Sequence, residues 1–142
     1  MVDIVIPGVP VAKPRAKGFY NKGTGRMHHY YKNDKELKSF EQLIKLKAEE
    51  LFPKPLTGPI RLSVQFLMPR PQSMMWKKRE MPRVPCAKRP DADNLIKTIE
   101  DSLNGIAYID DGQISELHVW KNYHAGDEGP KTIIRIEENA QN

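Results

Sequence analysis

The stretch Ile60-Arg-Leu-Ser-Val-Gln-Phe-Leu-Met68 decides the fold class of this chain. Apolar residues occupy every second position along it, and the polar residues Arg61, Ser63 and Gln65 stand between them. This period of two is typical of a β-strand that buries one face and leaves the other in contact with polar surroundings. The sequence therefore predicts a strand at 60–68 with one face in the core.

Amphipathic helices are predicted on both sides of that strand in the sequence. Apolar residues recur at three- and four-residue steps over 37–51, after a capping-box pattern formed by Asn33 and Glu36. A second apolar series covers 95–103 and stops at Asn104-Gly105, as a helix C-cap does. We expect both helices to lie with their apolar stripes against a sheet.

The remaining elements complete an α+β pattern. Alternating apolar residues predict further strands at 2–6, 114–123 and 132–136. Residues 8–32 read as a loop, in which a turn at Gly23-Thr24-Gly25 suits a hairpin. The expected order is β-α-β-α-β-β, with the helices packed on one side of a small mixed sheet in a single small domain that covers 1–142.

Length and composition narrow the functional classes. A chain of 142 residues fits one domain and leaves no room for a separate cofactor domain. The single cysteine, Cys86, excludes an internal disulfide and a cysteine zinc site, which favours the reducing cytoplasm. No secretion signal and no apolar run of roughly 18 residues occurs, so we expect no membrane attachment. The glycine turn lacks the Gly-Lys-Ser/Thr of a phosphate loop, so no nucleotide cofactor is expected.

Charge is divided unevenly along the chain. Residues 1–89 carry 19 lysines and arginines against 7 acidic residues, whereas residues 90–142 carry 4 against 11. Seven of the basic residues fall within 70–89, called here the basic segment, with Glu80 as its one acid. We expect a flexible loop that neutralises nucleic-acid phosphates, and a merely solvated loop is the alternative.

Acidic residues gather directly after the basic segment. Five aspartates lie within 21 residues, at positions Asp91, Asp93, Asp101, Asp110 and Asp111. Clustered carboxylates repel one another unless a cation relieves the repulsion, and oxygen-only ligands suit Mg²⁺ or Mn²⁺. Lys97 lies four residues after Asp93 and four before Asp101, so the three share one helix face.

Plain structural roles for these acids remain open at this point. Asp93 would serve as a helix N-cap, Lys97 and Asp101 as a surface ion pair, and Asp111-Gly112 as a turn. Taken jointly, the acids beside a dense basic segment favour a magnesium-dependent enzyme that acts on a phosphodiester of a nucleic acid.

Three motifs also resemble the RusA family of Holliday junction resolvases, which are small endodeoxyribonucleases common in phages and prophages. The motifs are Arg89-Pro-Asp-Ala-Asp-Asn-Leu-Ile-Lys97, Asp101-Ser-Leu-Asn-Gly105 and Asp110-Asp-Gly-Gln-Ile114. A weaker similarity covers Pro10-Val-Ala-Lys-Pro-Arg15. The resemblance implies that Asp91, Asp93 and Asp111 are catalytic metal-binding acids and that Lys97 is an essential lysine. It leaves the roles of Asp101 and Asp110 open.

The resemblance further implies a substrate and an assembly. Family members are homodimers that bind a four-way DNA junction and cut two opposed strands symmetrically during recombination and repair. The residues expected to hold the DNA are Lys13, Arg15, Lys77, Lys78, Arg79, Lys88 and Arg89.

Two alternatives stay beside this hypothesis. The first is a general or flap- and fork-selective metal-dependent nuclease, which keeps the chemistry and changes the substrate. The second is a non-catalytic DNA-binding module, in which the acids are caps and turns and the basic segment makes the contacts.

Overall fold

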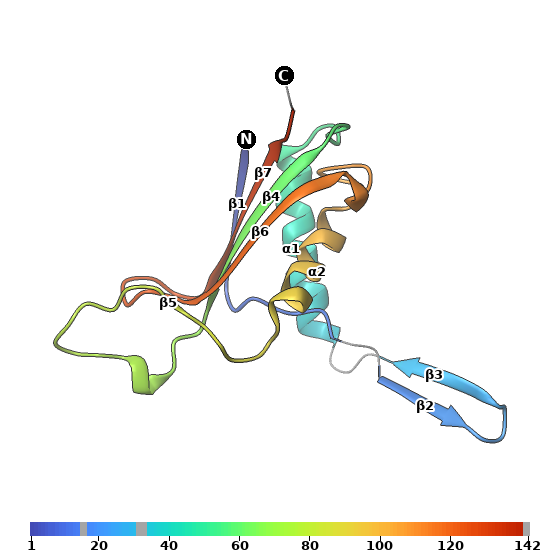
Figure 1. Ribbon diagram of the computed structural model, residues 1–142, viewed down its shortest axis with the longest axis horizontal. Coiled ribbons are helices and arrows are strands. Elements are labelled where there is room, and N and C mark those ends of the chain that lie inside the picture. Colours follow the sequence, from blue (N-terminus) through green and yellow to red (C-terminus); the bar gives the residue numbers. More distant parts are fainter. Residues whose placement is uncertain (15–16, 31–33, 141–142) are drawn as a thin grey trace.

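A five-stranded mixed sheet is the central element of the computed structural model, which describes residues 1–14, 17–30 and 34–140 (Figure 1). The strands lie in the order β1 (Val2–Pro7), β7 (Lys131–Glu138), β4 (Ile60–Met68), β6 (Ile114–Tyr123) and β5 (Val84–Pro85). Strands β4 and β6 are parallel, and the other neighbours are antiparallel. The predicted mixed sheet is confirmed.

Strand β4 lies in the middle of the sheet because its sequence supplies one wholly apolar face. Leu62, Val64 and Phe66 have no exposed surface, whereas Ser63 and Gln65 on the opposite face are partly exposed. Burial of an aliphatic or aromatic side chain stabilises a fold by about 1.5–3 kcal/mol. The period of two therefore fixes which face of the sheet enters the core, and the predicted bounds of 60–68 are confirmed.

Both helices cover that apolar face of the sheet, as Figure 1 shows. Helix α1 (Asp34–Leu51) buries Phe40 and Ile44, and helix α2 (Ala92–Leu103) buries Leu95 and Ile99. Both predicted helices are confirmed. At the end of α2, Gly105 adopts a φ of 84°, a left-handed conformation that favours glycine and ends the helix.

Helix α2 is the crossover between the parallel strands β4 and β6. A parallel pair needs such a crossover, because its two strands run in the same direction. The connection contains two 3₁₀ turns, η1 (Gln72–Met74) in the basic segment and η2 (Asp111–Gln113) directly before β6. All of the predicted site aspartates lie between β5 and β6.

A separate hairpin of β2 (Lys17–Asn21) and β3 (Arg26–Tyr30) extends away from the body of the molecule (Figure 1). Gly25 in its turn has a φ of 68°, as the glycine turn at 23–25 predicts. Arg15 and Asn33 lie outside the described residues, so the structure gives no account of the capping box predicted at Asn33.

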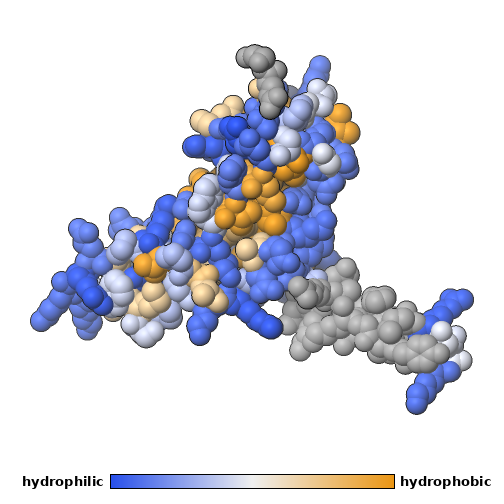
Figure 2. All heavy atoms as spheres, viewed as in Figure 1, coloured by the Kyte–Doolittle hydropathy of each residue, from blue (hydrophilic) through white to orange (hydrophobic). Residues whose placement is uncertain are grey.

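The surface separates apolar from hydrophilic residues. Apolar residues gather on the body, while hydrophilic ones predominate on the basic segment at the left of Figure 2. Within the described ranges, no helix combines the length and the apolar character needed to cross a bilayer.

Candidate active site

The segment that delivers the first aspartate is fixed to strand β6 by Lys121. The Lys121 ammonium donates hydrogen bonds to the carbonyl oxygens of Lys88 at 2.6 Å and Pro90 at 2.8 Å. In addition, the Cys86 N–H donates to the Lys121 carbonyl at 3.0 Å. Three hydrogen bonds thus hold residues 86–90 against β6, directly before Asp91, the N-cap of α2.

Asp91 and Asp93 stand exposed at the N-terminus of α2. Asp91 is the N-cap residue with extended backbone angles, and its carboxylate makes no capping hydrogen bond. Asp93 follows in the first turn of the helix. The helix dipole favours negative charge at this end. Neither carboxylate forms a hydrogen bond or an ion pair with any residue that the structure describes.

Lys97 and Asp101 continue the same face of α2. The Lys97 Nζ lies 3.4 Å from Oδ1 of Asp101. The second oxygen of that carboxylate, Oδ2, lies 2.7 Å from the Nζ of Lys13. The main-chain N–H of Lys13 donates a hydrogen bond to the Asn94 carbonyl at 3.0 Å. Lys13, predicted to contact DNA, is therefore engaged with α2 through both its main chain and its side chain.

The Asp-Asp-Gly-Gln motif divides into structural and unpaired parts. Asp110 accepts a hydrogen bond from the Gly112 N–H at 2.9 Å and forms a capping box with Gln113. The Gln113 amide also donates to the Leu56 carbonyl at 2.8 Å, which ties the turn to the body. The Asp111 carboxylate makes no hydrogen bond or ion pair within the described part of the chain, although the Asp111 carbonyl accepts a hydrogen bond from the Ile114 N–H. Of the two adjacent aspartates, Asp111 is thus the one left open for chemistry.

Glu100 joins this surface, although the sequence analysis did not single it out. Partial burial raises the pKa of Glu100, and the negative charges of Asp111 and Asp101 add to the effect while Lys97 opposes it. Because the charge of Asp111 acts on the Glu100 carboxyl, Asp111 lies near the second half of α2. The spacing of seven residues from Asp93 to Glu100, two helical turns, was the signal that would have found it.

The aspartates do not form one compact metal cluster. In residues 1–14, 17–30 and 34–140, no three His, Cys, Asp or Glu side chains lie close enough together to hold a metal ion. Asp91 and Asp93 lie at the start of α2, while Asp111 interacts with Glu100 farther along the helix. The donors are all carboxylates, which fits Mg²⁺, because this ion keeps several waters and binds only one or two protein carboxylates.

The basic segment has an internal anchor. Arg70 is buried and donates hydrogen bonds to the carbonyls of Met74 and Pro82, both at 2.8 Å. Its guanidinium also lies 4.8 Å from the centre of the Trp76 ring, and that of Arg79 lies 3.9 Å from it. The predicted DNA-binding residues whose side chains are exposed are Lys77, Lys78, Arg79, Lys88 and Arg89.

An α+β fold that carries open carboxylates at a helix, preceded in the chain by a basic segment, fits the class of nucleases. Such proteins need positive charge to bind the phosphate backbone and carboxylates to organise the reaction at one phosphate. A comparison with protein families agrees, since the model of the endodeoxyribonuclease RusA family matches residues 7–137. The chain belongs to the RusA family of endodeoxyribonucleases.

Two relatives are similar to this chain over most of its length, and the second carries the name of this family. The chain is 31% identical over 144 residues to the uncharacterized protein YqaN of Bacillus subtilis (strain 168), and the match covers 96% of both chains. It is also 31% identical over 132 residues to the crossover junction endodeoxyribonuclease rusA of Lactococcus phage r1t. That second match covers 92% of this chain and 85% of the phage protein.

Proposed function

We propose that this protein is a magnesium-dependent endodeoxyribonuclease that resolves four-way DNA junctions by paired symmetrical nicks, in recombination and repair within the cytoplasm. The observation that carries the proposal is that the carboxylates of Asp91, Asp93 and Asp111 have no partner among the described residues, in a chain of the RusA family whose helix α2 also carries Lys97. The phage relative is named for crossover junctions, which supports this substrate.

The chemistry that we propose distributes roles among these residues. The carboxylates that would hold Mg²⁺, or Mn²⁺ in its place, are those of Asp91, Asp93 and Asp111, of which an ion that keeps several waters needs only one or two at a time. The bound ion would supply Lewis-acid chemistry at a phosphodiester. The Lys97 ammonium stabilises the negative charge that develops on the non-bridging phosphate oxygens. Lys121 and Gln113 hold the main-chain segments on which Asp91 and Asp111 lie.

We assign DNA binding to cations of the basic segment and of the N-terminal segment. The basic segment contributes Lys77, Lys78, Arg79 and Lys88. Arg89, at the end of the basic segment, lies two residues before Asp91. Arg15 belongs to the same set of proposed DNA-binding residues. Each phosphate that a cation neutralises releases counterions, so the affinity should fall steeply as the salt concentration rises.

A homodimer accounts for the paired nicks. A two-fold axis presents two identical active sites to a junction that can adopt the same symmetry. Each subunit then cuts one of two opposed strands. The dimer is part of the proposal, and its measurement is the molar mass of the purified protein by light scattering.

The experiment that tests the function compares two labelled substrates, a four-way junction and a linear duplex of the same sequence, each with Mg²⁺ and with EDTA. We expect symmetrical paired nicks in the junction alone, lost in EDTA. Equal cutting of both substrates would replace junction resolution with a general nuclease activity. Labelled flap and fork substrates are assayed in the same way, and cutting of these as well as the junction would indicate a branch-selective nuclease. Tight binding without any cutting would indicate a non-catalytic DNA-binding module.

A further inference from the structure

Asp101 differs from the other aspartates near α2 because a lysine engages each of its carboxylate oxygens. The Nζ of Lys13 lies 2.7 Å from Oδ2, and the Nζ of Lys97 lies 3.4 Å from Oδ1. Burial by itself would raise the pKa of Asp101, but the two ammonium groups outweigh it and lower this pKa. A carboxylate held in this way stays ionised, and its charge is already balanced by two ammonium groups.

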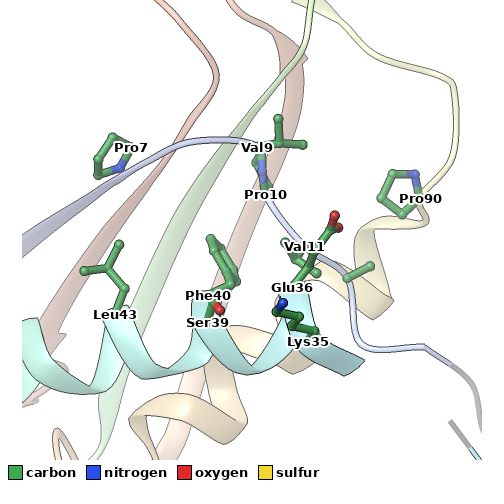
Figure 3. A pocket seen from close by; sticks show the side chains of 11 residues that line it. Pro7, Val9, Pro10, Val11, Lys35, Glu36, Ser39, Phe40, Leu43 and Pro90 are labelled. Atoms are coloured by element: carbon green, nitrogen blue, oxygen red, sulfur yellow. The ribbon is translucent and has the colours of Figure 1, made fainter. Parts of the chain in front are cut away.

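Lys13 reaches Asp101 from a segment 88 residues earlier in the chain. This segment leads from the end of β1 past the start of α1 to the start of α2, as Figure 3 shows. Val11 and Ala12 pack against the core, and the Lys13 N–H donates to the Asn94 carbonyl at 3.0 Å. The placement of the Lys13 side chain is therefore set by the fold and does not depend on bound DNA.

Lys97 gains its position from this arrangement. Its side chain is 54% exposed, and an exposed lysine otherwise samples many rotamers. Asp101 lies one helical turn farther along and attracts the Lys97 ammonium. This attraction holds the ammonium on the face of α2 that also carries Asp93. Lys13 fixes the carboxylate of Asp101, and Asp101 in turn holds Lys97. The position of Lys97 therefore depends indirectly on Lys13, which lies outside the sequence motif of Lys97.

We propose that Asp101 and Lys13 are positioning residues for Lys97, and that Lys13 is not a phosphate contact. The inference rests on the proposed function, in which Lys97 acts at the phosphate that is cut. It assigns Asp101 to an ion-pair relay, Lys13–Asp101–Lys97, and separates it from the aspartates proposed to bind metal. The relay leaves one net positive charge beside the site.

A double-mutant cycle tests the relay in the full-length protein. The variants are Lys13→Ala, Asp101→Asn and the pair combined, with Lys13→Arg as the conservative replacement. Two quantities are measured on a labelled four-way junction: the single-turnover cleavage rate at saturating enzyme with Mg²⁺, and the dissociation constant in EDTA at several salt concentrations. Thermal unfolding of every variant identifies any loss of fold, in which case Lys13→Arg and Asp101→Asn carry the comparison.

We expect each single variant to lower the cleavage rate about tenfold, because a small displacement of a catalytic group slows the chemical step. The combined variant should be no slower than either one, since both break the same relay. Lys13→Arg should restore most of the rate. The dissociation constant should stay within twofold of that of the wild type, with an unchanged salt dependence.

The opposite pattern defines a phosphate contact. If Lys13→Ala weakens binding, lowers the salt slope by about one and adds its effect to that of Asp101→Asn, the inference is overturned. Lys78→Ala, in the basic segment, provides that pattern as a positive control. Lys45→Ala removes the same charge on the exposed side of α1 and should change neither quantity. Wild-type protein that cuts no DNA contradicts the proposed function itself, and the relay with it, whereas an active wild type with additive variants contradicts the relay alone.

Discussion

Two surfaces of this molecule treat acidic residues in opposite ways. On the uncovered face of the sheet and the adjoining loop, called here the paired surface, acids have basic partners: Arg135 lies 2.8 Å from Asp3, and Arg61 pairs with Glu116. Those partners lower the pKa of both carboxyls. On the α2 surface, Asp91 and Asp93 at the N-terminal end of the helix have no such partner among the described residues, whereas Asp101 farther along the helix is paired with Lys13 and Lys97.

The difference separates charge that is neutralised within the fold from charge that is left open to a ligand. A carboxylate beside an arginine is satisfied in the folded protein and needs nothing more. Carboxylates grouped without a counter-charge repel one another, so the fold holds them in a state that a cation would stabilise. At Glu100, burial is the main cause that raises the pKa; Lys97 opposes the increase, and the negative charges of Asp111 and Asp101 add to it.

The largest effect is expected when an acid is neutralised on each surface in turn. Asp93→Asn should lower junction cleavage on the order of 10³-fold and leave junction binding intact or tighter, because a repulsive charge has been removed. Asp3→Asn, the matched change on the paired surface, should leave cleavage within twofold. Single-turnover assays and gel-shift titrations measure both. A normal cleavage rate in Asp93→Asn would show that the α2 surface is not the active site.

A second comparison concerns two lysines that donate to main-chain carbonyls. Lys121→Met should lower cleavage about 10- to 100-fold, because the ammonium holds the carbonyls of Lys88 and Pro90 just before Asp91. Lys47 donates to the Val5 carbonyl at 2.7 Å, away from the site, so Lys47→Met should leave cleavage unchanged. Equal losses in the two variants would point to general destabilisation, which thermal unfolding would reveal.

The paired surface also predicts how stability depends on pH. Hydrogen bonding from Arg83 outweighs the effect of burial and lowers the pKa of Glu128 from 4.5 to about 2. A carboxyl whose pKa is lower in the folded state stabilises the protein above the unfolded-state value, and this stabilisation is lost as the pH falls from 4.5 toward about 2. Glu128→Gln should therefore lower the free energy of unfolding by roughly 2 kcal/mol at pH 7.

Urea unfolding of Glu128→Gln and of the wild type, followed from pH 7 down to the acid range, measures this effect. The two curves of stability against pH should converge as the acid range is reached. A constant difference at every pH would mean that the substitution acts through packing and not through the charge of Glu128.

The smallest effect is expected at Glu100, with the opposite sign. A carboxyl whose pKa is raised by folding costs stability once the pH exceeds its ordinary value of 4.5. Glu100→Gln should thus slightly raise the free energy of unfolding of the metal-free protein at pH 7, by less than Glu128→Gln lowers it. The gain should disappear below pH 4.5. If Glu100→Gln destabilises the protein at pH 7, the contrast between the two surfaces does not hold at this position.

Much of the architecture follows from local patterns. The alternation in 60–68 requires a strand with one buried face, and the apolar series that ends at Asn104-Gly105 requires a helix that stops there. Periodicity and capping act over a few residues, so the chain itself records them. The glycine turn at 23–25 likewise predicts the hairpin that the structure contains.

Local sequence patterns predict only part of the candidate site. Asp110 and Asp111 are adjacent and identical, yet one caps a 3₁₀ turn and the other stays unpaired. Lys13 carries no mark that separates a DNA contact from a partner of Asp101. Lys121 belongs to an ordinary alternating strand, and nothing nearby in the sequence shows that its ammonium holds the carbonyls before α2.

The difference between what the sequence predicts and what only the tertiary structure decides has a physical cause. Neighbours along the chain determine the helix and strand boundaries. They also determine the sign of the charge in each half of the chain and the grouping of aspartates within 91–111. Which acids receive a counter-charge depends on neighbours in space. Lys13 meets Asp101 across 88 residues and Lys121 meets Pro90 across 31, and such pairs form only when the sheet and its crossover helix have assembled.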